Sequence, residues 1–197
     1  RALEAGVDTI EHGSALDDAM IGLFRHNPRA LRGWSALIPT LSAGLPLTEI
    51  DQKTTGITDI QLSNSRTVVS GMVAGAADAR KAGIRVGVGT DAAMTFVTQY
   101  GTWRELDLLV KRAGFSTAEA IHAATQVNAE ILGVGDTTGS IEAGKAADLL
   151  VLDANPIIDL RALRQPALVV ADGRPVWRPR IRRFDDIDAL LDRAFRE

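Results

Sequence analysis

The stretch VGVGTD at residues 86–91 is a short apolar run that ends in a carboxylate, Asp91. Because side chains alternate along a strand, the two glycines and Asp91 share one face, while Val86, Val88 and Thr90 share the other. The valine face is expected to pack against helices, and the glycine face to leave room for something that approaches the backbone closely. The stretch therefore predicts a buried strand that presents Asp91 at its carboxyl end.

A second run of this kind, DTIEH, lies near the start of the chain at residues 8–12 and ends in His12. A third segment typical of a short strand, LIPTL, occupies residues 37–41. The carboxyl ends of parallel strands lie at one edge of a sheet, and barrel enzymes carry their chemistry there. We therefore expect His12 and Asp91 to emerge at the same rim.

Helical patterns separate and follow these strands. Alternating strands and helices are typical of βαβ units in a parallel α/β sheet. Part of a (β/α)8 TIM-type barrel is favoured, and a doubly wound sheet is the structural alternative. A nucleotide-binding version of that alternative has weak support, because no Gly-x-Gly-x-x-Gly turn opens a helix. Apolar spacing predicts the helices at residues 17–26, 63–82, 102–113 and 117–132.

The sequence also predicts the structure of two other regions in this part of the chain. Residues 42–61 are rich in Gly, Thr, Pro and Asp, and they predict a long loop with at most a helical turn, as in an active-site loop. Residues 1–6 are typical of the end of a helix that is capped by Gly6. Without an initiating methionine, this start favours a longer protein over a processed or trimmed chain.

The pattern changes after Gly133 to that of a small antiparallel unit. Residues 147–152 and 167–171 are typical of strands, and the Asp-Gly pair that follows predicts a hairpin turn. Residues 185–195 have the spacing of an amphipathic helix. The arginines of residues 178–183 predict a solvated linker rather than a nucleic-acid patch, because no aromatic residues are interleaved and acids follow them.

Composition excludes several classes of protein. The chain has 197 residues, 46% of them hydrophobic and 24% charged, with a net charge of -3, which is typical of a soluble globular protein with a sizeable core. The absence of cysteine excludes disulfides, thiolate zinc sites and a cysteine nucleophile. The sequence has no apolar run of about 18 residues and no visible signal peptide. We expect a protein that acts on a small molecule and has neither nucleic acid nor a membrane as its partner. A cytoplasmic location is expected, although a chain without cysteine also suits secretion.

His12 and Asp91 are the candidate metal ligands. Imidazole and carboxylate are natural ligands of zinc and similar ions, which bring the pKa of bound water close to neutrality. Asp91 could also accept a proton from that water and pass it to a leaving amine. The structural alternatives are a capping aspartate and a hydrogen-bonded histidine. Two ligands do not complete a catalytic site, so the chain carries only part of one.

Other polar and aromatic residues rank below these two. Tyr100, the only tyrosine, follows the Asp91 strand and is a candidate substrate-binding residue, with packing as the alternative. The same alternatives apply to Trp103 and Arg104. His26 lies at a predicted helix C-terminus and His122 lies opposite the apolar stripe of its helix, so neither is expected to bind a metal.

The succession of segments resembles the C-terminal half of the amidohydrolase superfamily, in particular its imidazolonepropionase-like and prolidase-like metal-dependent hydrolases. AGVDTIEHG at residues 5–13 resembles the sixth-strand motif with its metal-binding histidine, and IPTL at 38–41 resembles the seventh strand. VGTD at 88–91 resembles the eighth strand with its catalytic aspartate. The helical signature matches AIHAAT at 120–125 with the Asn-Ala and Leu-Gly pairs that follow, and GSIEAGKAADL at 139–149 is the most specific motif. Together these motifs cover about residues 1–177.

The resemblance implies a fold, a chemistry and a domain organisation. It implies a hydrolase of amide, cyclic amide, dipeptide or ester-like bonds that holds one or two divalent metals, with zinc as the expected ion. His12 would be a metal ligand, and Asp91 both a ligand and the catalytic proton shuttle. Residues 1–137 would form strands 6 to 8 of the barrel with their helices, 138–180 would contribute strands to a small β-sandwich domain, and 181–197 would be a terminal amphipathic helix.

The same resemblance indicates what this chain lacks. The paired histidines of the first strand, the bridging lysine or acid of the fourth and the histidine of the fifth would lie before Arg1, so the isolated chain is not expected to be catalytically complete. A partial barrel exposes strand edges, so the expected partner is the N-terminal half of the same protein, another chain, or a second copy in a homo-oligomer. The alternatives are a non-catalytic scaffold without metal and a phosphotriester or lactone hydrolase with the same metals.

Overall fold

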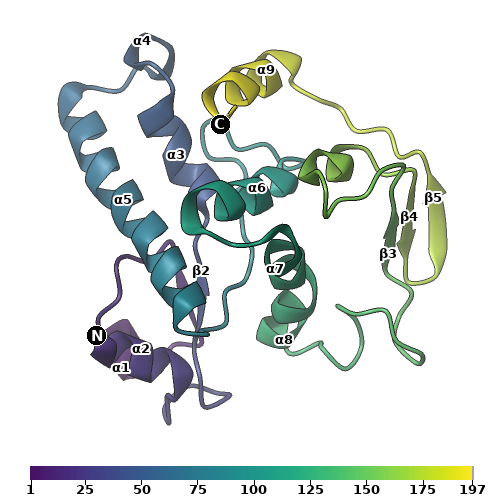
Figure 1. The fold of residues 1–197 in the computed structure, drawn as a ribbon, viewed down its shortest axis with the longest axis horizontal. Coiled ribbons are helices and arrows are strands. Elements are labelled where there is room, and N and C mark those ends of the chain that lie inside the picture. The colour runs from purple at the N-terminus through teal and green to yellow at the C-terminus, as the bar shows by residue number, and fades with distance from the viewer. Residues whose placement is uncertain (197) are drawn as a thin grey trace.

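The computed structural model describes residues 1–196 and shows an α/β fold in which helices pack on a short parallel sheet (Figure 1). Strand β1 (Thr9–Glu11) pairs in parallel with β2 (Ala36–Ile38), and Ile10 lies opposite Leu37. Val86 joins the same sheet through one parallel bridge to Leu37. The parallel arrangement predicted for the three strand-like segments is therefore confirmed at their buried ends.

Most of the remaining elements are helices, and the strands of a small second sheet lie between α8 and α9 in the chain. Within the described residues, no helix is both long and apolar enough to cross a membrane. The helices are α1 (Ala2–Ala5), α2 (Asp18–Arg25), α3 (Leu41–Glu49), α4 (Gln52–Thr55), α5 (Asp59–Lys81), α6 (Thr102–Ala113), α7 (Thr117–His122), the π-helix η1 (Ala123–Val127), α8 (Asn128–Leu132), the 3-10 helix η2 (Leu160–Arg164) and α9 (Asp185–Ala194). The strands of the second sheet are β3 (Leu149–Val151), β4 (Leu168–Ala171) and β5 (Arg174–Trp177).

The helices predicted from periodicity are confirmed, and local capping explains their ends. The side chain of Asp17 accepts a hydrogen bond from the first turn of α2. A capping box of Ser116 and Glu119 starts α7. Gly114 ends α6 in the left-handed conformation, with φ of 76°. Helix α5 starts four residues before its predicted beginning, because Thr58 begins it with a capping box of its own.

The prediction of a long loop at residues 42–61 is wrong, because most of this segment forms α3 and α4. Helix α3 contains Pro46, yet it packs closely against α5. A Cβ on Gly44 would lie 2.8 Å from Cγ2 of Val69, so the glycine allows that close approach. Leu45 is buried in the core on the same helix. Burial against α5 therefore outweighs the weak helix propensity of glycine and proline.

The prediction that residues 86–91 form a strand up to Asp91 is wrong beyond Val86. The backbone of Val88 pairs with the side chain of Asn128 instead: the Val88 N–H donates to Oδ1 at 2.9 Å, and Nδ2 donates to the Val88 carbonyl at 3.0 Å. The expected room beside the glycines is filled, because a Cβ on Gly87 or Gly89 would lie within 2.8 Å of the Ile38 side chain. Asn128 thus replaces a neighbouring strand.

A π-helical stretch places Asn128 where it can do this. The predicted helix at 117–132 consists of α7, η1 and α8 in direct succession, and η1 is a π-helix. Such π-helical turns occur often at functional sites. Here η1 precedes Asn128, the first residue of α8, whose amide holds the segment leading to Asp91.

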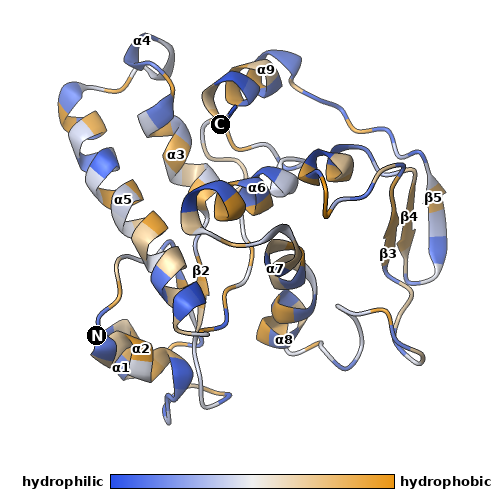
Figure 2. Cartoon of the chain, viewed as in Figure 1, coloured by the Kyte–Doolittle hydropathy of each residue, from blue (hydrophilic) through white to orange (hydrophobic). Residues whose placement is uncertain are grey.

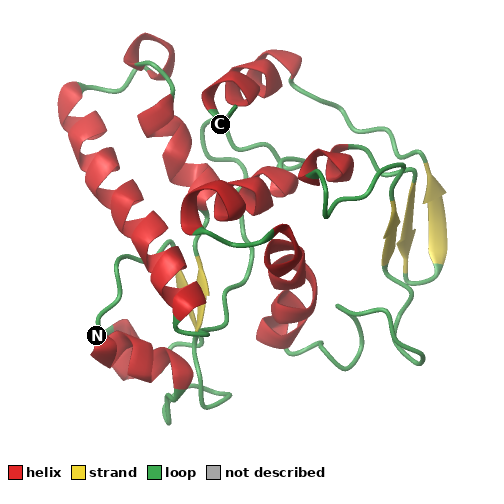
Figure 3. Ribbon diagram, viewed as in Figure 1, coloured by secondary structure: helices red, strands yellow, loops and turns green. Residues whose placement is uncertain are grey.

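The core lies where the short parallel sheet meets α3, α5 and α6. Leu37 of β2, Ala76 of α5 and Leu109 of α6 are each fully buried in one apolar cluster. In the view of Figure 3, β1 and β2 overlap the C-terminal end of α5. The sheet edge that leads to His12 therefore rests on a packed core.

The second sheet confirms the predicted hairpin. Strands β3, β4 and β5 are antiparallel neighbours, and the turn between β4 and β5 has positive φ at Asp172 (49°) and Gly173 (73°). Two successive positive φ values are typical of the tight hairpin turn that an Asp-Gly pair favours. The sheet stands at the side of the helical body, and β3 and β4 are strongly hydrophobic (Figure 2).

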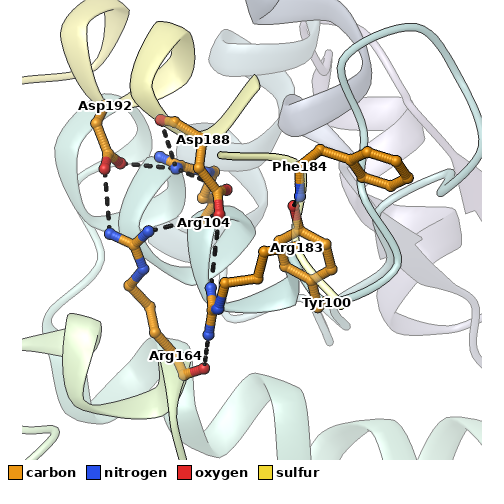
Figure 4. A network of polar contacts seen from close by, with 7 residues as sticks. All are labelled: Tyr100, Arg104, Arg164, Arg183, Phe184, Asp188 and Asp192. Atoms are coloured by element: carbon orange, nitrogen blue, oxygen red, sulfur yellow. Dashed lines mark hydrogen bonds and ion pairs between the residues drawn. The ribbon is translucent and has the colours of Figure 1, made fainter. Parts of the chain in front are cut away.

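Buried ion pairs attach the C-terminal helix α9 to α6 and η2 (Figure 4). Arg104 Nη2 lies 2.6 Å from an Asp192 carboxylate oxygen and 3.5 Å from Asp188 Oδ1. Arg164 lies 3.1 Å from Asp192 and 3.6 Å from Asp188. Burial raises the pKa of Asp192, but the hydrogen bond and charge of Arg104, with those of Arg164, lower that pKa overall. The carboxylates of Asp188 and Asp192 therefore connect α9 to both α6 and η2.

The third cation of this network comes from the arginine-rich segment. Arg183 lies 3.6 Å from Asp188 Oδ2, donates to the backbone carbonyl of Arg164, and stacks 5.3 Å from the centre of the Tyr100 ring. The prediction that residues 178–183 form a solvated linker is therefore wrong at Arg183, because the acids of α9 draw it inward. Arg178 remains exposed, as expected. The last residue of the predicted 181–197 segment, Glu197, lies outside the described residues.

Candidate functional site

Three strained residues lie directly after the three parallel segments. His12 follows β1, Thr40 follows β2 by two residues, and Asp91 follows the segment that begins at Val86. Their φ angles are 64°, 49° and 55°, all in the left-handed region. This conformation is uncommon for residues other than glycine, and for a β-branched threonine it is an outlier. Such strain costs about 1–3 kcal/mol at each residue and collects at active sites, which makes this edge the candidate site.

His12 is held by Thr40, a residue that the sequence analysis did not single out. Nδ1 of His12 lies 2.5 Å from the Thr40 hydroxyl, and that hydroxyl donates to the Pro39 carbonyl at 2.8 Å. A hydroxyl has one hydrogen, so Thr40 accepts from Nδ1–H of His12 in the tautomer that carries its proton there. The lone pair of His12 is then on Nε2. Metal-binding histidines are commonly oriented through their other ring nitrogen, and the predicted role of His12 has this feature.

Asp91 is exposed and begins a strained segment. Its carbonyl accepts from the Met94 N–H at 3.2 Å, and Ala93 and Phe96 also have positive φ, at 86° and 68°. On the preceding residue, the Thr90 carbonyl accepts a hydrogen bond from the Ser42 hydroxyl at 3.3 Å. The start of α3 therefore contacts both candidate regions: Thr40 bonds His12, and Ser42 bonds the residue before Asp91.

The donor chemistry of His12 and Asp91 fits a divalent metal. Imidazole nitrogen and carboxylate oxygen are zinc donors, and a catalytic zinc uses three protein ligands. Within residues 1–196, no three His, Cys, Asp or Glu side chains come together in a way that could hold a metal. A metal held by His12 and Asp91 would therefore need further donors.

Glu105, on α6, is a buried acid that the sequence analysis missed. Its side chain is fully buried, and its two oxygens accept from the backbone N–H groups of Leu41 (2.8 Å) and Ser42 (2.7 Å) at the start of α3. Burial raises the pKa of Glu105 to about 7, while hydrogen bonds from Ser42 and Leu41 act in the opposite direction. No local sequence signal marks this residue, because its partners lie more than 60 positions away.

The raised pKa of Glu105 predicts a pH dependence of stability. Between its ordinary value of 4.5 and about 7, the folded protein retains a proton that the unfolded chain releases. Stability should therefore fall as the pH rises through this window, by at most about 1.4 kcal/mol per pH unit from this group. Urea unfolding at several pH values should show this slope, and E105Q should remove it. Parallel curves for the wild type and E105Q would contradict the assignment.

The remaining sequence candidates lie elsewhere. The Tyr100 hydroxyl accepts a hydrogen bond from the Phe184 N–H at 2.7 Å, so it contacts the C-terminal segment (Figure 4). Its substrate-binding role stays a prediction, as do the metal roles of His12 and Asp91. Trp103 is buried in the helical body. His26 forms the C-cap of α2, and His122 lines an open cleft of about 390 Å³ on another part of the surface.

Comparisons with a family model and with solved structures agree on the family of this chain. A model of the amidohydrolase family matches residues 1–176. The crystal structure of a candidate prolidase from Bifidobacterium longum is 71% identical, with a TM-score of 0.97 over 98% of this chain and 48% of that one. A Xaa-Pro dipeptidase, solved with methionine in its active site, is 30% identical, with a TM-score of 0.73 over 89% of this chain and 41% of that one.

A curated relative extends the comparison. Ochratoxinase of Aspergillus niger is 38% identical over 92 residues, which are 45% of this chain and 18% of that protein. This chain therefore spans less than half the length of each of these proteins. The match to the family model nevertheless includes His12, Thr40, Asp91 and Glu105.

Proposed function

The chain belongs to the amidohydrolase family, and on that basis we propose that it forms part of a metal-dependent hydrolase of amide or dipeptide carbon–nitrogen bonds. In this proposal, His12 binds the metal through Nε2. Asp91 is both a metal ligand and the catalytic group that moves the proton. Residues 1–137 belong to a (β/α) barrel as strands 6 to 8, residues 138–180 to a small β-sandwich domain, and residues 181–197 to a terminal helix.

The observation that carries the proposal is the contact between His12 and Thr40. Because the Thr40 hydroxyl donates to Pro39, it accepts from His12 Nδ1 and leaves Nε2 as the free donor atom. The strained backbone of His12, Thr40 and Asp91 also supports the proposal that the reaction takes place at this edge of the sheet.

The chemistry of the chain's own residues follows from these positions. A divalent cation at this site supplies Lewis-acid activation of water and of the scissile carbonyl. Asp91 accepts the proton of the attacking water and delivers it to the leaving nitrogen, which departs as an amine. The contact of Nδ1 with Thr40 directs Nε2 of His12 away from that hydroxyl. Zinc is the ion that we propose. Its further ligands come from residues outside this chain or from a partner chain.

A dipeptide with a C-terminal proline is the first substrate class to test. The proposal rests on the 71% identity with the candidate prolidase and the likeness to the Xaa-Pro dipeptidase. Ochratoxin, as the similarity to ochratoxinase suggests, is the next substrate to test. In this proposal, loops outside the metal shell set the choice of substrate.

The test uses the full-length protein after removal of metal with a chelator. Addition of zinc should restore hydrolysis of Xaa-Pro dipeptides, measured as released proline, with phosphotriesters and lactones as comparison substrates. Preference for those substrates would favour the other hydrolase class instead. A folded protein that binds no zinc and hydrolyses none of these compounds would contradict the proposal and favour the scaffold alternative.

A further inference from the structure

The start of α3 is capped in an unusual way. Thr40 occupies the N-cap position, where a threonine side chain ordinarily accepts from the first turn, but it makes no such bond. Its hydroxyl is engaged by His12 and Pro39 instead. The free N–H groups of Leu41 and Ser42 are bound by the carboxylate of Glu105, one by each oxygen.

This arrangement differs from the other helix starts in the described part of the chain. Helices α2, α5 and α7 are capped by side chains that lie next to them in sequence and are solvent-exposed, at Asp17, Thr58 and Ser116. Glu105 reaches α3 from another helix and is completely buried, without a cationic partner among the residues described. A buried carboxylate is costly, and a local cap would have satisfied the same donors.

Two contacts lead from the segment that Glu105 holds to the candidate site. Thr40 bonds the imidazole of His12, and Ser42 donates to the Thr90 carbonyl, one residue before Asp91. Leu41 and Ser42, the two residues bound by Glu105, directly follow Thr40 in the chain. A shift of the first turn of α3 would therefore move both contacts together.

We propose that Glu105 is a positioning residue that sets the relative placement of His12 and Asp91 by holding the first turn of α3. The inference rests on the proposed function, which identifies this edge as the site. The contacts of Glu105 and Thr40 can nevertheless be tested without metal. Glutamine at position 105 keeps the size of the side chain and presents an amide NH2 to one of the two backbone N–H groups. One hydrogen bond is then lost, and the first turn of α3 is no longer held on both sides.

The first test is an NMR measurement on the metal-free, full-length protein. The Nδ1 proton of His12, bonded to Thr40, should give a downfield imidazole resonance that exchanges slowly with water. T40V should abolish this resonance and T40S should retain it, which assigns it. E105Q should weaken or abolish it, while Leu109→Val, which trims a buried side chain one turn further along α6, should not. A resonance in E105Q equal to that of the wild type would overturn the inference, whatever reaction the protein catalyses.

The second test measures the site with Co²⁺ as the probe metal. E105Q should weaken Co²⁺ binding by about 10-fold to 100-fold and change its absorption spectrum, as loss of an outer-shell partner does. Leu109→Val should leave both unchanged. If E105Q does not fold, the pair T40V and T40S carries the test: the inference requires T40V to lose Co²⁺ affinity and T40S to keep it. Equal behaviour of the two threonine variants would overturn it. Absence of Co²⁺ binding by the wild type would instead contradict the proposed function, and the NMR result would still decide the inference.

Discussion

D91N is expected to lower the turnover of an amide or dipeptide substrate by about 10² to 10⁴-fold, the usual contribution of a positioned proton-transfer group. The substitution conserves volume, and asparagine tolerates the left-handed backbone at φ of 55°. The fold should therefore be retained. The loss follows because the amide cannot take a proton from water and binds a divalent cation more weakly than a carboxylate does. Steady-state release of the amine product measures the effect.

Asp172 provides a matched control for this prediction. It is also an aspartate with a left-handed backbone, at φ of 49°, but it lies in the hairpin turn between β4 and β5. D172N makes the same chemical change at the same kind of conformation, away from the candidate site. Its turnover should equal that of the wild type. Retention of more than about a tenth of the wild-type turnover by D91N would contradict the catalytic assignment, given the magnitude expected of such a group.

D188A is expected to destabilise the protein by about 3–5 kcal/mol, the range found when one partner of a buried ion pair is removed. Asp188 is 5% exposed and faces Arg104, Arg164 and Arg183. Without it, Arg104 and Arg164 share the single carboxylate of Asp192, and Arg183 loses the carboxylate it faces. Urea unfolding of the two proteins, followed by circular dichroism, measures the difference.

An exposed ion pair provides the comparison for D188A. Asp153 lies 3.8 Å from Arg178, and both side chains are more than two-thirds exposed. Pairs of this kind contribute at most about 1 kcal/mol, so D153A should change the unfolding free energy little. A change of less than about 1 kcal/mol in D188A would mean that the buried network is not what holds α9 on α6.

The parts of the fold that depend on local chemistry could be predicted from the sequence. The glycine that ends α6, the capping box of α7 and the Asp-Gly turn each require particular residues at fixed spacing. The periodic apolar faces of the longer helices are equally local. For these elements, the pattern of neighbouring residues contains the physical cause of the structure.

The errors arose where distant contacts outweigh local preference. Residues 41–49 are helical despite Gly44 and Pro46, because the segment is buried against α5. The strand after Val86 ends early because Asn128 takes over its hydrogen bonds. The sequence marked His12 and Asp91, but Thr40 and Glu105 gave no signal. Their roles depend on partners 28 and more than 60 positions away.

The most direct test of the account is an anomalous-scattering map, at the zinc absorption edge, from zinc-loaded crystals of the full-length protein. We predict a peak that lies about 2.0–2.2 Å from both Nε2 of His12 and a carboxylate oxygen of Asp91. Nδ1 of His12 should still contact Thr40 in that map. A zinc peak bound by other residues, with these two side chains directed to opposite ends of the sheet, would contradict the account.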